Sequence, residues 1–218
     1  MVYDPPVAGL RELKKARTRQ LIAEVAARLF AERGYEHVTV SDIAREAEVS
    51  EQTVYNYFPS KEQLVTDRDE QVQDQLVKLI RARAPGVSPA GAVRDYVLAS
   101  VDAIATIPPD IWRGEIGYLA VISPTVHRLT LEMTDHQADA IAAAISDTTR
   151  VPAEVAKLQG TAIAGVYQTI FNHAGRRTHE GATQTQIAEE LRPIIETLLD
   201  ELDRWLSLSQ GGVRSRVR

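Results

Sequence analysis

The stretch that decides the fold runs from Arg17 to Leu64 and reads RTRQLIAEVAARLFAERGYEHVTVSDIAREAEVSEQTVYNYFPSKEQL. From Leu21 to Phe30 its apolar residues recur with the 3.6-residue period of an amphipathic helix. Gly34 stands where this helix should end with a left-handed backbone conformation. The pattern therefore predicts one long helix followed by a loop.

Capping residues predict two short helices and the start of a fourth. Thr39 with Asp42 three residues later is typical of a capping box, and Ser50 can cap the next helix. Pro59 then interrupts the pattern, and a second capping box begins at Ser60. Short helices joined by a tight turn on a three-helix base are the layout of a helix-turn-helix DNA reader.

This segment resembles the DNA-binding domain of the tetracycline-repressor (TetR) family. The match covers roughly residues 17–65, under a quarter of the chain. The residues that carry it are ARLFAERG (27–34), Thr39, Ile43, Ala44, Ala47, Val49, Ser50 and TVYNYFPSKEQL (53–64). The resemblance implies an all-α fold of about nine helices, in which a three-helix helix-turn-helix domain precedes a larger helical bundle for ligand binding and dimerisation.

The resemblance also implies that a helix at about 51–57 enters the major groove of DNA. Gln52 and Thr53 are then the best candidates for reading bases, because Gln can pair with adenine and the Thr methyl can meet a thymine methyl. The other expected DNA-binding residues, mostly toward phosphate, are Arg17, Arg19, Thr39, Ser41, Arg45, Ser50, Glu51, Tyr55, Asn56, Tyr57 and Lys61.

Two acidic residues depart from the family pattern. Glu48 occupies the turn position usually filled by Gly, and if that position needs a positive φ the departure costs about 1 kcal/mol. Glu51 begins the expected recognition helix, where its charge suits the helix dipole but repels phosphate. They support an alternative hypothesis, a helical dimer that binds small molecules and has lost DNA binding.

Composition limits the class of protein. The net charge is −5, yet residues 11–19 contain five basic residues and one acidic residue, so the chain has a basic edge near its N-terminus. There is no Cys, which excludes disulfides and thiolate metal sites. No apolar run approaches the ~20 residues of a membrane span, and the N-terminus lacks the apolar core of a secretory signal. We expect a cytoplasmic protein without a membrane partner.

The remainder of the chain is predicted to be helical. Helix starts are expected at Ser60, Ser88-Pro89, Ser123-Pro124, Val151-Pro152 and about Thr183, with an interruption at Pro108-Pro109. The expected domains are an N-terminal arm (1–16), the helix-turn-helix domain (17–65), an effector-binding and dimerisation domain (66–208) and a disordered basic tail (209–218).

Two long C-terminal helices are the expected homodimer interface. Small residues on the first would allow close approach, and an apolar stripe on the second would form much of the contact, although part of that stripe must be intramolecular core. The residues expected at the interface are Leu158, Ala162, Gly165, Ile187, Leu191, Ile194, Ile195, Leu198, Leu202 and Trp205.

The resemblance further implies a small-molecule effector in the central bundle, and the prevalence of Ala, Val and Ile favours an apolar one. The candidate wall residues are Tyr96, Trp112, Tyr118, His127, Met133, His136, Tyr167, Phe171 and Asn172. The five His form no HxH, HxxxH or HExxH pattern, and no GxGxxG, Walker A or GxSxG motif is present. The sequence therefore predicts no catalytic site, no metal and no cofactor. The function expected is a homodimeric regulator, most simply a repressor, that binds a near-palindromic DNA operator and is released by its effector.

Overall fold

The computed structural model describes residues 7–211, which contain ten α-helices and no strand. In chain order the elements are α1 (Val7–Arg33), η1 (Tyr35–His37), α2 (Val40–Glu46), α3 (Glu51–Tyr57), α4 (Gln63–Ala82), α5 (Pro89–Ala103), η2 (Ile104–Thr106), α6 (Pro109–Trp112), α7 (Ile116–Ile122), α8 (Pro124–Thr148), α9 (Ala153–His179) and α10 (Gln184–Gly211). The all-α prediction is confirmed, with α6 a single turn. Among these helices none is long and apolar enough to cross a membrane.

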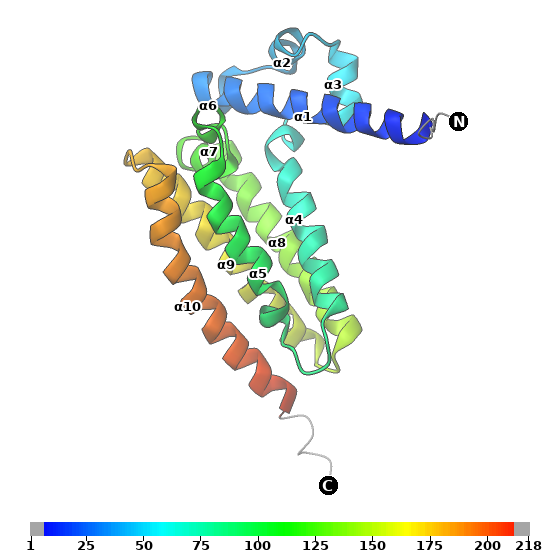
Figure 1. The fold of residues 1–218 in the computed structure, drawn as a ribbon, viewed down its shortest axis with the longest axis vertical. Helices are drawn as coiled ribbons and strands as arrows, with labels where there is room; N and C mark the ends of the chain where they lie inside the picture. The colour runs from blue at the N-terminus through cyan, green and yellow to red at the C-terminus, as the bar shows by residue number, and fades with distance from the viewer. Residues whose placement is uncertain (1–6, 212–218) are drawn as a thin grey trace, which may run out of the picture.

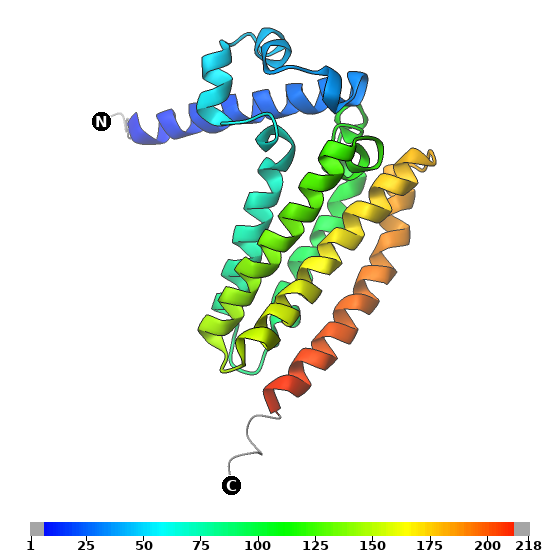
Figure 2. The same cartoon turned by 180° about the vertical axis from the view of Figure 1, so that it is seen from behind.

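Figure 1 shows α1 lying across one end of a bundle of long helices, with α2 and α3 on its far side. Helix α4 runs from this end into the bundle, so it links the two parts of the molecule. The view from behind shows α8 and α9 side by side and α10 along one edge (Figure 2). The chain is thus a small helical head attached to a larger helical body.

The helices begin where local chemistry predicts. The side chains of Ser88 and Ser123 accept hydrogen bonds from the backbone N–H of Gly91 and Val126, and a Pro follows each serine at the first helical position. The ends of the chain differ from the expectation. Residues 7–16 belong to α1 rather than to a separate arm, and α10 continues to Gly211. The rest of the expected tail, 212–218, lies outside the described residues.

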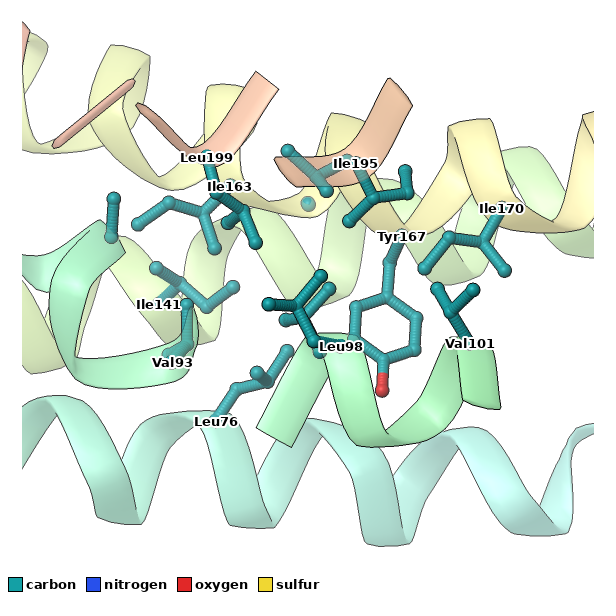
Figure 3. Packing of buried hydrophobic residues seen from close by; sticks show 14 of the residues in the cluster. Leu76, Val93, Leu98, Val101, Ile141, Ile163, Tyr167, Ile170, Ile195 and Leu199 are labelled. Carbon is teal, nitrogen blue, oxygen red and sulfur yellow. The ribbon is translucent and has the colours of Figure 1, made fainter. Parts of the chain in front are cut away.

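Two hydrophobic clusters form the core. One fills the head and includes Ile22, Phe30 and Phe58. The other fills the body, where side chains from α4, α5, α8, α9 and α10 interlock around Tyr167 (Figure 3). The partly buried Phe171 packs against both clusters, so the two cores are in contact.

The head and the body also meet through close backbone contact. A Cβ atom at Gly114, just after α6, would lie 1.8 Å from the carbonyl oxygen of Ala27 in α1. A Cβ atom at Gly175 in α9 would lie 1.9 Å from the carbonyl oxygen of Gly117 in α7. Only glycine fits at either position without movement of the backbone, and the α6–α7 segment therefore packs directly onto α1 and α9.

Candidate DNA-binding surface and effector cavity

The two short helices of the head are held by the predicted caps. Thr39 and Asp42 form the complete capping box: the Thr39 hydroxyl accepts from the Asp42 N–H at 3.1 Å, and the Asp42 carboxylate accepts from the Thr39 N–H at 3.0 Å. These hydrogen bonds, with that from Arg45, lower the pKa of Asp42 to about 2. The Ser50 hydroxyl accepts from the Thr53 N–H at 3.0 Å and caps α3.

Helix α3 presents a polar face to solvent. Val54 of the helix and Phe58 just after it are fully buried, so one side of the helix packs against the core of the head. Glu51, Gln52 and Asn56 are exposed on the other side, and the Gln52 side chain donates to the Asn56 side-chain oxygen at 3.2 Å. These are the residues that a major-groove reader of this layout would turn toward bases.

The other expected DNA-contacting residues surround this face. Tyr55 is 43% exposed, whereas Thr53 and Tyr57 are half-buried. The remaining exposed members are Arg17, Thr39, Ser41, Arg45 and Ser50. Most of the predicted residues are therefore exposed or half-buried on the head, and Arg45 is paired with Asp42.

Two of the residues predicted to contact phosphate, Arg19 and Lys61, also have partners within the head. The guanidinium of Arg19 forms an ion pair with Asp67 of α4, donates to the Tyr57 carbonyl at 2.8 Å and lies over the Phe58 ring at 4.6 Å. Its nitrogens are thus engaged by the end of α3 and the start of α4.

Lys61 is turned inward in the same way. Its ammonium donates to the Tyr35 carbonyl and lies 4.1 Å from the centre of the Tyr35 ring, and burial lowers its pKa. Arg19 and Lys61 thus bind Asp67 and the Tyr35 carbonyl, which are 48 and 26 residues away from them in the sequence. Their role here is to position α3 and α4.

The turn between α2 and α3 contains the predicted strained residue. Glu48 has a φ of 55°, a positive value unique among the described residues other than glycine. The Val49 N–H donates to the Ala44 carbonyl at 2.9 Å and the Glu48 N–H donates to the Arg45 carbonyl at 3.3 Å. This is a Schellman motif with Glu48 at the position where glycine is preferred.

A cavity of about 440 Å³ opens among α4, α5, α6, α7 and α9. Four of the predicted effector-contacting residues line it, namely Trp112, Tyr118, Tyr167 and Phe171. Several other wall residues were not predicted from the sequence: Ser100, Ile104, Ile107, Ile116 and Ile170. Three of these missed residues flank the Pro108-Pro109 interruption, a break that could have marked the wall.

Several polar groups of this wall have hydrogen-bond partners within the protein. The Trp112 indole N–H donates to the Thr178 hydroxyl at 2.9 Å. Ser100 donates to the Tyr96 carbonyl at 2.9 Å, so the Tyr167 hydroxyl, 2.7 Å away, donates to Ser100. The rest of the cavity wall is chiefly apolar.

The other predicted effector contacts lie elsewhere. Met133 and His136 line a separate cleft between α4 and α8. Tyr96, His127 and Asn172 line neither hollow, and the last two are exposed on the outer faces of α8 and α9. The prediction that these five residues line the effector cavity is therefore wrong for the cavity of about 440 Å³.

The apolar stripe of α10 divides into two faces. Ile187, Leu191 and Ile195 are fully buried against α5 and α9 of the same protomer, so their prediction as interface residues is wrong. Ile194 is 40% and Trp205 is 38% exposed, while Leu198 and Leu202 are partly buried. On α9, Leu158 is 58% exposed and a Cβ added at Gly165, near Ala162, would meet no atom within 4 Å.

Residues 22–67 match the family described as bacterial regulatory proteins of the tetR family. The matched segment contains α2, α3, their caps and the first turn of α4. The head of the chain is therefore similar to the TetR family. The curated relatives that the chain matches are named transcriptional regulators, a class that is not enzymatic, in agreement with the expectation from the sequence.

Among the curated relatives, the transcriptional regulator TcmR of Streptomyces glaucescens is 33% identical over 109 residues, which are 45% of this chain and 48% of TcmR. The transcriptional repressor KstR2 of Rhodococcus jostii is 35% identical over 103 residues, which are 47% of this chain and 44% of KstR2. The chain therefore spans less than half the length of each of these two relatives.

Solved structures extend the likeness to most of the chain. NalD of Pseudomonas aeruginosa, a secondary repressor of the MexAB-OprM efflux pump, superposes with a TM-score of 0.52 at 20% identity, covering 84% of this chain and 96% of NalD. A TetR-family protein from Syntrophomonas wolfei gives a TM-score of 0.52 at 17% identity, covering 85% of this chain and 96% of that protein. These matches show that the body, as well as the head, has the TetR-family fold.

Proposed function

We propose that the chain is a homodimeric transcriptional regulator that binds a near-palindromic operator and releases it when an apolar effector occupies the 440 Å³ cavity. The observation that carries the proposal is the exposed polar face of α3, held outward by buried Val54 and Phe58 and by the Ser50 cap. Repression rather than activation is favoured by KstR2, a named repressor that is 35% identical over its matched part. The site of action is then the cytoplasm, where operator DNA is accessible.

Dimerisation is part of the proposal because two heads must reach half-sites about 34–36 Å apart. The outer face of α10 (Ile194, Leu198, Leu202 and Trp205) and the open strip of α9 (Leu158, Ala162 and Gly165) supply apolar area and room for a second copy. A two-fold symmetric pair buries the same patch on both subunits, which matches a palindromic site.

Substitution tests this interface. Ile194→Glu should convert the dimer to a monomer in analytical ultracentrifugation, because it places a charge in the apolar contact. Leu131→Glu is the matched control, since Leu131 is an exposed apolar residue of α8 that is outside the proposed interface. A dimer that survives Ile194→Glu and dissociates with Leu131→Glu would contradict the assignment.

The effector is proposed to be chiefly apolar because the polar side chains of Ser100, Thr106, Trp112 and Tyr167 already hydrogen-bond within the protein. Glu115 and the Tyr118 hydroxyl are the other polar groups of the wall. The volume of about 440 Å³ lies within the usual ~300–1,000 Å³ of ligand pockets. An occupant that prefers one conformation by about 1.4 kcal/mol is enough to change operator affinity tenfold.

Selection of bound duplexes from a randomised DNA pool at low salt tests the reader. Enrichment of a near-palindrome with half-sites one helical turn apart is the expected result, and the selected duplex becomes the probe for release by apolar compounds. Failure to enrich any sequence, with the dimer folded, would instead favour the alternative of a small-molecule-binding dimer without DNA binding. The exposed acids Glu48 and Glu51 beside the reading face support that alternative.

A further inference from the structure

A second hollow lies on the other side of Phe171 from the effector cavity, between α4, α8 and α9. It has a volume of about 220 Å³, and we refer to it as the acidic cleft. Helix periodicity builds its walls: Glu62, the N-cap of α4, recurs with Thr66 and Glu70 at every fourth residue, and Leu129, Met133 and Gln137 do the same along α8. Phe171 of α9 lines both hollows.

The cleft has a single sign of charge. Three carboxylates line it, from Glu62, Glu70 and Glu132, and its described lining contains no Lys or Arg; His136 is its one other ionisable group. Glu62 accepts hydrogen bonds from its own backbone N–H and from Ser60, which lower its pKa and keep it ionised. Glu132 has Arg128 at 3.7 Å. Glu70 is exposed and forms no ion pair with any described residue.

The Gln137 amide provides an independent indication of a ligand. The residue is only 8% exposed, and its side chain makes no hydrogen bond to any residue in the described part of the chain; because no fully buried polar atom there lacks a partner, the amide atoms reach solvent through the cleft. It lies one turn from Met133 on the same face of α8, so its amide borders the cleft. Thr130 and Thr134 nearby direct their hydroxyls to backbone carbonyls, whereas the Gln137 amide, with the less buried Gln73 and Gln168, supplies neutral polar groups to the cleft.

We infer that the acidic cleft binds an organic monocation with an apolar body, such as a protonated aromatic amine. The carboxylates of Glu62 and Glu70 attract the charge, the Gln137 oxygen accepts one N–H, and Met133 and Phe171 contact the apolar part. A bare metal ion is disfavoured because no group of three or more acids and histidines in the described residues has the spacing to hold one. This inference does not rest on DNA binding or on the effector cavity.

Methyl NMR offers a probe placed inside the cleft. The chain has two methionines, Met1 and Met133, so a protein labelled at methionine methyl groups reports on Met133 with Met1 as internal reference. The full-length protein is titrated at neutral pH with benzylammonium and, separately, with uncharged benzyl alcohol. The Met133 resonance should shift with saturable dependence on benzylammonium and respond more weakly to benzyl alcohol.

Variants locate the binding. Glu70→Gln should weaken benzylammonium binding about two- to fivefold, the range for a solvent-exposed charge pair. Asp74→Asn, which removes an exposed acid of α4 outside the cleft, should leave it unchanged. Gln137→Leu should also weaken binding by removing the amide acceptor.

Three results would overturn the inference. They are equal responses to the charged and uncharged probes, an affinity insensitive to Glu70→Gln, and a Met133 shift abolished by Trp112→Ala but not by Glu70→Gln. The last result would place the probe in the effector cavity, because Trp112 lines that cavity alone.

Discussion

Replacing Glu48 with glycine should stabilise the protein, because the turn before α3 holds this residue at a φ of 55°. An L-residue in the left-handed region is about 1–2 kcal/mol less favourable than in the right-handed one, and glycine avoids this strain. Glycine also increases the entropy of the unfolded chain, and this effect cancels about 0.4–1 kcal/mol of the stabilisation. The net gain expected for Glu48→Gly is about 1 kcal/mol, or ~2–4 °C in the melting temperature of a protein of this size.

The chain contains a natural reference for this estimate. The end of α9 forms the same motif with glycine in place: the Ala182 N–H donates to the Arg177 carbonyl, and Gly181 has a φ of 88°. A Cβ atom at Gly181 would meet nothing within 4 Å, so Gly181→Ala tests backbone conformation alone. It should lose about 1 kcal/mol, the opposite of the change at Glu48.

Thermal unfolding followed by circular dichroism separates conformation from charge when Glu48→Gln is included. The glutamine variant keeps the strained φ and should melt with the wild type. Equal stabilisation by Gln and Gly, or a lower melting temperature for Glu48→Gly, would refute the argument from φ.

The same variants make a prediction about DNA. One carboxylate about 10 Å from a phosphate repels it by about 0.4 kcal/mol in water, so both Glu48→Gln and Glu48→Gly should raise operator affinity about twofold at low salt. Because salt screens this repulsion, the gain should shrink at high salt. A gain for glycine alone would attribute the change to the turn instead.

Three further predictions concern packing, readout and capping. Gly160→Ala should melt below the wild type by about 1–3 kcal/mol in thermal denaturation, since its Cβ would lie 2.4 Å from a backbone oxygen of α8; an unchanged melting temperature would contradict the packing. Gln52→Ala should lose about 1–3 kcal/mol of discrimination at one or two operator positions, measured by repeating the duplex selection, and an unchanged preference would exclude base readout by this residue. Thr39→Ala should destabilise the protein by about 1 kcal/mol equally at pH 8 and pH 5. Its capping partner Asp42 has a pKa of about 2 in the folded protein, so the capping contribution is complete above the usual pKa near 3.8 and is lost only as the pH falls toward 2. A different loss of stability at pH 8 and pH 5 would show that another group titrates.

Features set by neighbours in sequence were predictable from the chain alone. The caps at Thr39, Ser50, Ser88 and Ser123 depend on hydrogen bonds that span three residues, and the structure has all four. The reading face of α3 follows from the same local information. Helices α6 and α7 were not predicted individually, because a single turn and a seven-residue helix leave too short a periodic pattern beside paired prolines.

Features set by distant partners were not predictable. Arg19 resembles a phosphate ligand until α4 brings Asp67, 48 residues away in sequence, to its guanidinium. On α10 the inner residue Ile195 and the outer residue Ile194 are chemically identical, and only the positions of α5 and α9 decide which one is covered. The effector cavity is likewise assembled from five helices, so aromatic residues alone could identify part of its wall but not its limits.

Helix α4 begins in one core and ends in the other. Its Leu64 is buried with the residues of the head, whereas Leu76 and Ile80 are buried with those of the body, and the domain boundary expected at residue 65 falls inside this one helix. Because a helix propagates cooperatively along its backbone hydrogen bonds, loss of either core frays the support of the other. Unfolding should therefore proceed as a single transition for the whole chain, and amide protons of the head should exchange through the same global opening as those of the body.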